Sequence, residues 1–320
     1  MHHNSVHHKR TTVLATAIAT AIAFTTATGT SQAATTTVTG RIRVPWTEQT
    51  VFALSPTDSY VTEWMGLSSG WTVIGGPASR VYAGSAGVFA TDPSSGDIWE
   101  YSGTPNSWTE IGGPGKEFAE GGGHLYGLGP NGAYVAEWNG TPGSWTVIGG
   151  TAQDIYAGTD GVIATAQSTN SSGDVWHYNG TPGDWSDIGG HGWDFAVGNG
   201  VIYRADDNLT SVSEWTSGTT WTPILTTGKD IINLVGGDQG VYVYDYSTAG
   251  NQIFEYAGTP NTWSLIASGT GPFPEVESAT SLYGVVEGPT GPTSVDQYSG
   301  TGTSWTVIGG PADPNLAAGD

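Results

Sequence analysis

Five charged residues recur at one position of a repeated sequence, and they are the residues of this chain best placed to do chemistry. Each lies nine residues after a tryptophan that opens a repeat, and they are Arg80, Glu117, Asp154, Asp194 and Asp230. Because each comes just before the expected first strand of its repeat, these side chains should line one shared rim. Four carboxylates and a guanidinium could hydrogen-bond the hydroxyls of a sugar or hold a hard cation. The alternative is an acidic face that only water contacts.

One repeat differs from the others beside this position. Trp193 stands where the other repeats have Ser79, Lys116, Gln153 and Lys229. An additional indole among polar residues is hard to explain by packing alone, and aromatic rings stack on the C–H faces of sugars. We therefore predict that the best single pocket lies between the fourth and fifth repeats, at His191, Trp193 and Asp194.

An aromatic residue preceded by a polar one ends the third expected strand of every repeat. The pairs are Glu63-Trp64, Glu100-Tyr101, Glu137-Trp138, His177-Tyr178, Glu214-Trp215, Glu255-Tyr256 and Gln297-Tyr298. Neighbouring residues of a strand point to opposite faces of the sheet. One interpretation is that the aromatic residue packs with the repeat tryptophan between two sheets. The other is that some of these gaps stay open and present indoles and carboxylates to a sugar.

The sequence lacks the patterns typical of catalysis. Beyond residue 33 it has three histidines, His124, His177 and His191, and no G-x-S-x-G, H-E-x-x-H or C-x-x-C motif. Glycoside hydrolysis needs two placed acids, but the acids here recur with the repeat. We therefore expect the chain not to be an enzyme, and we assign no catalytic residue, metal site or cofactor.

The repeat itself predicts the fold. The phrase W-T-x-I-G-G, or a relative of it, begins at intervals of 36 to 42 residues, at Trp71, Trp108, Trp145, Trp185, Trp221, Trp263 and Trp305. A period near forty is typical of propeller blades. After Trp71, apolar runs bounded by turn residues cover 81–84, 87–91, 98–101 and 107–111, which suits four short strands. We predict an all-β fold, a seven-bladed β-propeller of four-stranded antiparallel blades.

The two ends of the chain indicate how the ring closes. Residues 51–71 align with residues 125–145, so the first repeat lacks its first strand. Residues 311–319 match residues 77–84 instead. We therefore expect Asn315 to Gly319 to form the innermost strand of blade 1, which closes the ring and removes exposed sheet edges.

The N-terminal segment has the composition of a secretory signal. Residues 1–33 contain basic His7 to Arg10, an apolar stretch, and small residues before an expected cleavage after Ala33. We divide the chain into a signal peptide at 1–33, an extension at 34–46 and the propeller at 47–320, and we expect a secreted, extracellular protein with no membrane span. Without Lys9 and Arg10, six basic residues face 29 acidic ones, a net charge of −23 that disfavours nucleic acid and anionic lipid.

The extension at 34–46 is needed by no blade. It holds Arg41 and Arg43, two of the six remaining basic residues. One interpretation is a tail that is either free or laid on the propeller wall. The other is a strand that docks a partner protein.

The repeat pattern W-x-x-I-G-G, followed by an apolar residue and G-x-x-G before two apolar residues, resembles the tectonin and tachylectin group of β-propeller lectins. The resemblance covers about Val51 to Gly319 and is most complete in repeats two to five. It implies glycan binding by several pockets between blades, without catalysis. An exported propeller with an actinobacterial-looking signal also resembles the lectin subunits of secreted umbrella toxin particles.

These observations lead to one functional hypothesis and one alternative. The hypothesis is a secreted carbohydrate-binding protein whose ligands are glycans and whose site residues are Arg80, Glu117, Asp154, His191, Trp193, Asp194 and Asp230. The alternative is a subunit of a secreted complex or toxin particle, in which the propeller or the extension binds another protein.

Overall fold

The chain forms a ring of β-sheets in a computed structural model, which describes residues 50–167, 173–226, 230–237, 240–247, 250–269, 271–277, 281–288, 290–310 and 312–319. The predictions for residues 1–33 and 34–46 lie outside these ranges. Apart from a single turn of 3-10 helix, Pro130–Gly132, the regular structure of the described residues is all strand.

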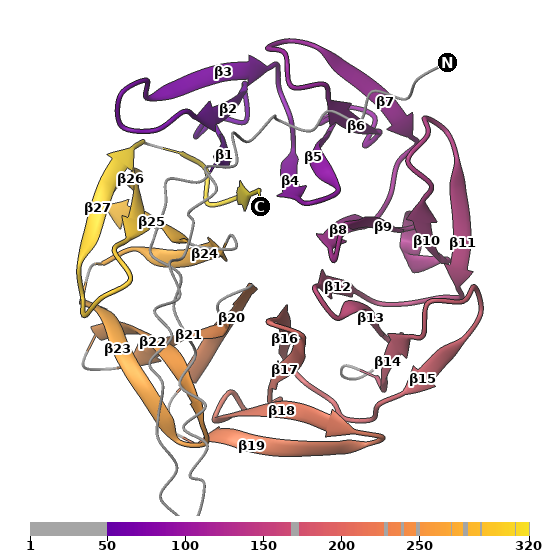
Figure 1. Ribbon diagram of the computed structural model, residues 1–320, viewed down its shortest axis with the longest axis vertical. Coiled ribbons are helices and arrows are strands. Elements are labelled where there is room, and N and C mark those ends of the chain that lie inside the picture. Colours follow the sequence, from indigo (N-terminus) through magenta and orange to yellow (C-terminus); the bar gives the residue numbers. More distant parts are fainter. Residues whose placement is uncertain are drawn as a thin grey trace, which may run out of the picture. The chain divides into compact units, whose positions relative to one another are not determined.

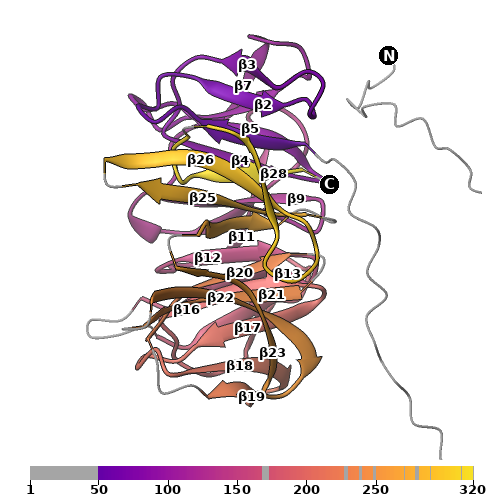
Figure 2. The same cartoon turned by 90° about the vertical axis from the view of Figure 1, so that its left-hand side faces the viewer.

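Seven antiparallel sheets of four strands each surround a central opening, and each sheet is one blade (Figure 1). Seen edge-on, the strands run roughly along the axis of the ring (Figure 2). From the inner strand outward, blade 1 consists of β28 (Leu316–Ala318), β1 (Val51–Leu54), β2 (Val61–Trp64) and β3 (Trp71–Gly75), and blade 2 of β4 (Arg80–Gly84), β5 (Gly87–Thr91), β6 (Ile98–Tyr101) and β7 (Trp108–Gly112). Blade 3 consists of β8 (Glu117–Gly121), β9 (His124–Leu128), β10 (Val135–Trp138) and β11 (Trp145–Gly149). Blade 4 consists of β12 (Ile155–Gly158), β13 (Gly161–Thr165), β14 (Val175–Tyr178) and β15 (Trp185–Asp187).

The remaining three blades have the same strand order. Blade 5 consists of β16 (Asp194–Gly198), β17 (Val201–Ala205), β18 (Ser211–Ser217) and β19 (Thr220–Thr226). Blade 6 consists of β20 (Asp230–Gly237), β21 (Gly240–Ser247), β22 (Gly250–Thr259) and β23 (Thr262–Gly269). Blade 7 consists of β24 (Phe273–Glu277), β25 (Leu282–Gly288), β26 (Gly291–Tyr298) and β27 (Trp305–Gly309). The predicted fold class is confirmed, and the four strands predicted after Trp71 agree with β4 to β7 to within one residue.

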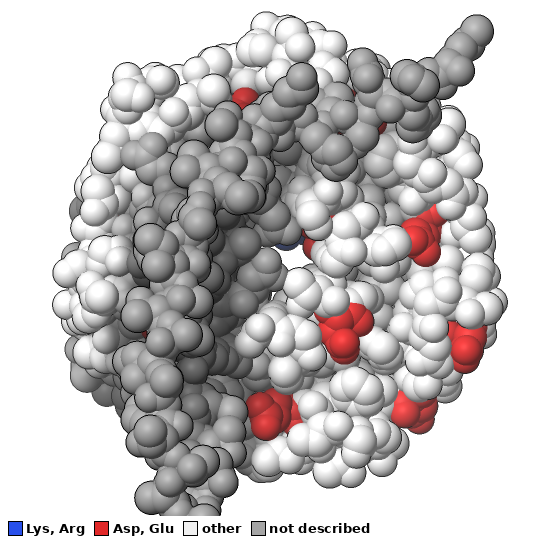
Figure 3. Space-filling view, in the orientation of Figure 1, with Lys and Arg blue, Asp and Glu red and all other residues white. Residues whose placement is uncertain are grey.

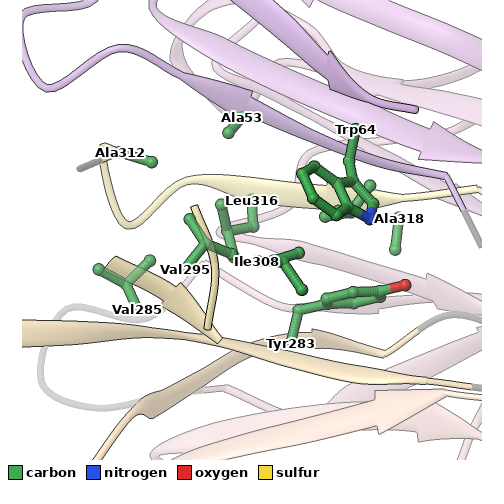
Figure 4. Close-up of a cluster of buried hydrophobic side chains, with 10 residues drawn as sticks. Ala53, Trp64, Tyr283, Val285, Val295, Ile308, Ala312, Leu316 and Ala318 are labelled. Atoms are coloured by element: carbon green, nitrogen blue, oxygen red, sulfur yellow. The ribbon is translucent and has the colours of Figure 1, made fainter. Parts of the chain in front are cut away.

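The ring closes in blade 1 with a strand from the other end of the chain, as predicted. β28 pairs with β1, placing Leu316 opposite Ala53 and Ala318 opposite Val51. Figure 4 shows Leu316 and Ala318 between Trp64 of blade 1 and Tyr283 of blade 7. These side chains are all buried, so the closing strand contributes to the core between the first and the last blade.

Each repeat tryptophan joins its blade to the one before. Its indole N–H donates to the carbonyl oxygen of the isoleucine in the preceding I-G-G phrase or its counterpart, at 2.7 to 3.1 Å. The seven pairs are Trp71 with Ile308, Trp108 with Ile74, Trp145 with Ile111, Trp185 with Ile148, Trp221 with Ile188, Trp263 with Ile224 and Trp305 with Ile266. The same hydrogen bond therefore recurs at every blade boundary.

In blades 1, 2, 4, 6 and 7 the aromatic residue that ends the third strand packs on this tryptophan. Its counterparts in blades 3 and 5 contact residues of the neighbouring blade, Trp138 against Phe89 and Trp215 against His177. The ring centroids of Tyr101 and Trp108 are 5.0 Å apart, and those of Tyr178 and Trp185 are 5.2 Å apart. Such tilted aromatic contacts stabilise a core beyond the area they bury. In both pairs the aromatic residue packs with the repeat tryptophan, as the first of the two interpretations of these residues expects.

The first glycine of the I-G-G phrase leaves room for the next tryptophan. A Cβ atom on Gly75 would lie 2.8 Å from Nε1 of Trp108, whereas one on Gly76 would meet no atom within 4 Å. We expect Gly75→Ala to lower the free energy of unfolding by about 1 to 3 kcal/mol, since overpacking forces neighbouring groups to shift. The matched Gly76→Ala should stay within about 0.5 kcal/mol of the wild type. Equal effects of the two changes in chemical denaturation would contradict this role of Gly75.

Candidate functional site

The loops between consecutive blades carry the predicted site residues, or end directly before them, and so place them on one side of the ring. The loops that lead from an outer strand to the next inner strand lie on the same side as the loops between the second and third strands of a blade. We call this side the entry side. It carries the loop at 113–116 before Glu117, the loop at 150–154, which ends with Asp154, and the loop at 188–193 before Asp194.

Three of the seven predicted residues line one cavity in the central channel. The cavity has a volume of about 410 Å³ and is bounded by β4, β8, β12 and β28. Arg80, Glu117 and Asp154 contribute to its wall, together with Glu120 and Tyr156. The predicted rim is thus partly assembled, over blades 2 to 4.

Two of the rim carboxylates are hydrogen-bonded to the backbone of the next blade. Glu117 accepts a hydrogen bond from the N–H of Ile155, at the start of the inner strand of blade 4. Asp194 accepts from the N–H of Leu234, in the inner strand of blade 6, at 2.7 Å, and from the N–H of Phe195 at 2.9 Å. Burial raises the pKa of Glu117, and it raises the pKa of Asp194 to about 6. Both carboxylates therefore link adjacent inner strands.

The raised pKa of Asp194 predicts a pH dependence of stability. The folded protein holds this proton more tightly than the unfolded chain, in which an aspartate has a pKa near 4, so folding takes up protons between about pH 4 and 6. This carboxyl therefore disfavours the fold above that window and ceases to do so as the pH falls through it. Relative to Asp194→Asn, the wild type should gain on the order of 1 kcal/mol between pH 7 and pH 4 in urea unfolding. A constant difference between the two proteins would refute this.

The other predicted residues are placed separately. Asp154, already described in the wall of the cavity, forms an ion pair with Lys116 at 2.8 Å. Asp230 begins β20, and only its backbone belongs to the described part of the chain. His191 and Trp193 are exposed on the loop at 188–193, whereas the carboxylate of Asp194 bonds toward blade 6. The structure thus does not gather all seven residues into one site.

Negative charge is dispersed over the surface that can be seen. On the face shown in Figure 3, acidic side chains occur singly or in small groups around the ring. Within the described ranges, no three histidine, aspartate or glutamate side chains are close enough together to hold a metal ion.

A groove that the sequence predictions missed lies between blades 3 and 4. It has a volume of about 210 Å³ and is lined by Val135, Gly149, Gly150, Thr151, Ala152, Ala164, Thr165, Ala166, Trp176 and Trp185. Trp185 forms the inter-blade hydrogen bond described above, while Trp176 is 37 % exposed. In the sheet Ala164 pairs with Trp176, so the small side chain leaves space beside the large one.

The boundary between blades 1 and 2 repeats this arrangement. Ala90 pairs with Trp99, as Ala164 pairs with Trp176. Neither indole N–H donates to any residue in the described part of the chain, although the repeat tryptophans all do. Tyr60 and Tyr134, exposed at 41 % and 40 %, hold the same position on the preceding blade of each pair. We call these two boundaries, with their indoles, the tryptophan grooves, naming the one between blades 1 and 2 by the analogy of its residue pairing.

A signal for these grooves was present in the sequence. The residue two places before the aromatic end of the third strand alternates in size along the first five repeats: Thr62, Trp99, Ala136, Trp176 and Ser213. The phrase S-S-G-D-[IV]-W also occurs only at 94–99 and 171–176. Comparing the repeats two at a time would have identified both tryptophans.

Comparison with known proteins supports the fold alone. No protein-family model matches the chain, and no curated protein matches its sequence. Among solved structures, it is similar to a protein of unknown function from Desulfotomaculum acetoxidans DSM 771, at 11% identity and a TM-score of 0.56, over 85% of this chain and 99% of that one. It is also similar to the β-propeller domain of the Trilobed protease from Pyrococcus furiosus, at 11% identity and a TM-score of 0.58, over 85% and 97%. That domain is described as having an open velcro topology, whereas β28 closes the ring here.

The expectation that the chain is not an enzyme is corrected by these similarities. Puromycin hydrolase matches with a TM-score of 0.60 at 12% identity, over 84% of this chain and 54% of the hydrolase chain. A propeller of this shape therefore forms part of a hydrolase, so the architecture gives no ground for excluding catalysis. At this identity the likeness shows the fold and transfers no reaction.

Within the described residues, no helix has the length and apolarity that a membrane crossing needs.

Proposed function

We propose that this propeller binds carbohydrate in the two tryptophan grooves. The observation that carries the proposal is the equivalence of Trp99 and Trp176. Each lies at a blade boundary beside an alanine, and neither indole N–H has a partner among the described residues. Packing alone does not call for an accessible indole at the same place in two blades.

The chemistry of the groove between blades 3 and 4 suits a sugar ring. The C–H face of a pyranose stacks on an indole, and the indole N–H can donate to a sugar oxygen. Thr151 and Thr165 add hydroxyl groups to a lining without charged side chains. Two equivalent sites on one molecule also strengthen binding to a glycan-covered surface without any new contact. The resemblance of the repeats to tectonin and tachylectin lectins supports the same conclusion.

A glycan array tests this proposal. The wild type should bind a restricted set of glycans, and Trp176→Ala should lose signal on that set while its melting temperature stays nearly unchanged. Leu67→Ala removes another exposed apolar side chain, 69 % accessible, from the loop between β2 and β3, and should bind as the wild type does. An array with no signal above background, or equal signals from all three proteins, would disprove carbohydrate binding in the tryptophan grooves.

We also propose that the protein is secreted, which residues 1–33 support. Sequencing the N-terminus of the protein from culture medium should give Ala34. The alternative function, docking in a secreted complex, is supported by Arg41 and Arg43 of the extension, outside the described residues.

A further inference from the structure

The boundary between blades 4 and 5 carries a cation where the tryptophan grooves carry an indole. In those grooves the second and third strands pair a small residue with a large one, Ala164 with Trp176. At the next boundary the corresponding pair is Arg204 with Ser213. At this boundary the larger residue of the pair is therefore on the second strand rather than the third, and it carries a guanidinium instead of an indole.

The main chain that faces Arg204 has a different conformation from the corresponding segment at the preceding boundary. Gly189 and Gly190 have φ angles of 66° and 84°, whereas the corresponding Gly149 and Gly150 lie outside this left-handed region. A Cβ atom on Gly190 would lie 1.7 Å from Nη1 of Arg204, so the guanidinium occupies the space that a side chain at this position would take. The outer strand β15 also ends early, at Asp187, whose Oδ1 accepts from the N–H of Gly189 at 2.7 Å.

The guanidinium has few partners for a group with five donors. It lies 4.5 Å above the ring of Trp221 and donates to the carbonyl oxygen of His191 at 3.2 Å. Within the described residues it forms no ion pair. The nearby carboxylate of Asp206 accepts hydrogen bonds from the N–H groups of Thr210 and Ser211, at 2.7 and 3.0 Å.

The electrostatics agree with an incompletely balanced charge. Burial lowers the pKa of Arg204, and the nearby Asp206 and Asp207 only partly oppose this effect. A half-buried cation of this kind gains from an anion that offers two acceptor oxygens, which match the fork of a guanidinium. At physiological ionic strength, charges more than about 8 Å away are largely screened, so distant acidic residues weaken this attraction little.

An accessible aromatic ring is part of the same loop. Trp193 is 63 % exposed and follows His191 by two residues. Its backbone N–H donates to the carbonyl oxygen of Ala205 at 3.0 Å, which fixes the loop to the strand that carries Arg204. The exposed ring and the guanidinium thus belong to a loop and a strand that this hydrogen bond joins, at the same blade boundary.

We propose that the boundary between blades 4 and 5 binds a carboxylate-bearing sugar residue, a hexuronic acid, with Arg204 receiving the carboxylate and Trp193 stacking on the ring. The sugar part of this inference rests on the proposed function, whereas the anion part rests on Arg204 alone. The propeller would then have two kinds of site on its entry side, for neutral and for acidic residues of a glycan.

Matched glycosides that differ only at C6 test this proposal. The probes are methyl β-D-glucuronide and methyl β-D-glucoside, with the corresponding galacturonide and galactoside, titrated into protein labelled with ¹⁵N at the indole N–H groups. A uronide should shift the signal of Trp193 at a concentration about ten-fold lower than its neutral counterpart, the scale of one charge-assisted hydrogen bond. Raising the salt concentration should reduce this preference.

Variants assign the preference to the guanidinium. Arg204→Ala should abolish it, and Arg204→Lys should retain only part, because an ammonium lacks the fork that matches a carboxylate. Trp176→Ala should leave the preference unchanged. Uronide binding at Trp193 with no neutral binding at Trp176 would support this inference and contradict the proposed function.

Other results would overturn the inference. One is the absence of any Trp193 shift with either uronide. Another is an unchanged preference in folded Arg204→Ala. A third is new binding of a neutral glycoside at Trp221 in Arg204→Ala without uronide binding in the wild type, which would make Arg204 a plug that closes a third groove.

Discussion

Deleting residues 311–320 should lower the midpoint of thermal unfolding by more than about 10 °C. The deletion removes β28, leaves β1 with an unpaired edge, and exposes Ala53, Trp64 and Tyr283 where they pack against Leu316 and Ala318. Exposing several buried apolar side chains costs about 1.5 to 3 kcal/mol each, and 1 kcal/mol corresponds to about 2 to 4 °C in a chain of this size. Differential scanning calorimetry measures this change.

Two controls separate ring closure from the loss of a few contacts. Leu316→Ala should cost about 2 to 4 kcal/mol, as for other large-to-small core changes, and should keep a single unfolding transition. Removing Asp320 alone should have little effect, because β28 ends at Ala318. A deletion variant that melts within about 2 °C of the intact chain would show that β28 does not hold the ring closed.

Replacing both groove tryptophans, as Trp99→Ala with Trp176→Ala, should weaken binding to a surface coated with the preferred glycan by about 100-fold. An aromatic contact of this kind contributes roughly 1 to 1.5 kcal/mol, close to ten-fold in affinity, and two linked sites lose both contributions as well as their cooperation. Each single change should cost about ten-fold. Surface plasmon resonance on immobilised glycan measures all three affinities.

The same experiment tests whether the tryptophan grooves are equivalent. If only one of the two single changes weakens binding, only one groove is a site, and the alternation of the repeats has another cause. If the double variant binds as the wild type does while its circular dichroism is unchanged, glycan recognition lies elsewhere on the ring.

The sequence alone was sufficient to predict the architecture. The W-T-x-I-G-G phrase recurs because each copy supplies an indole and the carbonyl and glycine that receive the next indole, as Ile74 and Gly75 do for Trp108. A contact made identically at every boundary leaves a periodic pattern in the chain. The incomplete first repeat and the match of residues 311–319 to residues 77–84 in the same way determined where the ring closes.

The candidate sites were less predictable, since they depend on which side chains face each other across a boundary. Sequence reasoning placed Glu117 and Asp194 on a binding rim, but the structure directs their carboxylates to the N–H groups of Ile155 and Leu234. Those partners lie about forty residues away, and no local pattern distinguishes a carboxylate that bonds backbone from one that faces solvent.

Only the tertiary structure decided which boundaries are open. Strand register places Ala164 beside Trp176 and Arg204 beside Ser213, and the conformation of Gly189 and Gly190 makes room for the guanidinium. Repeats that share the W-T-x-I-G-G phrase thus produce an open groove at one boundary and a covered tryptophan at the next. The physical reason is that a groove is the space left between two packed sheets, and that space depends on pairs of side chains that are distant in sequence.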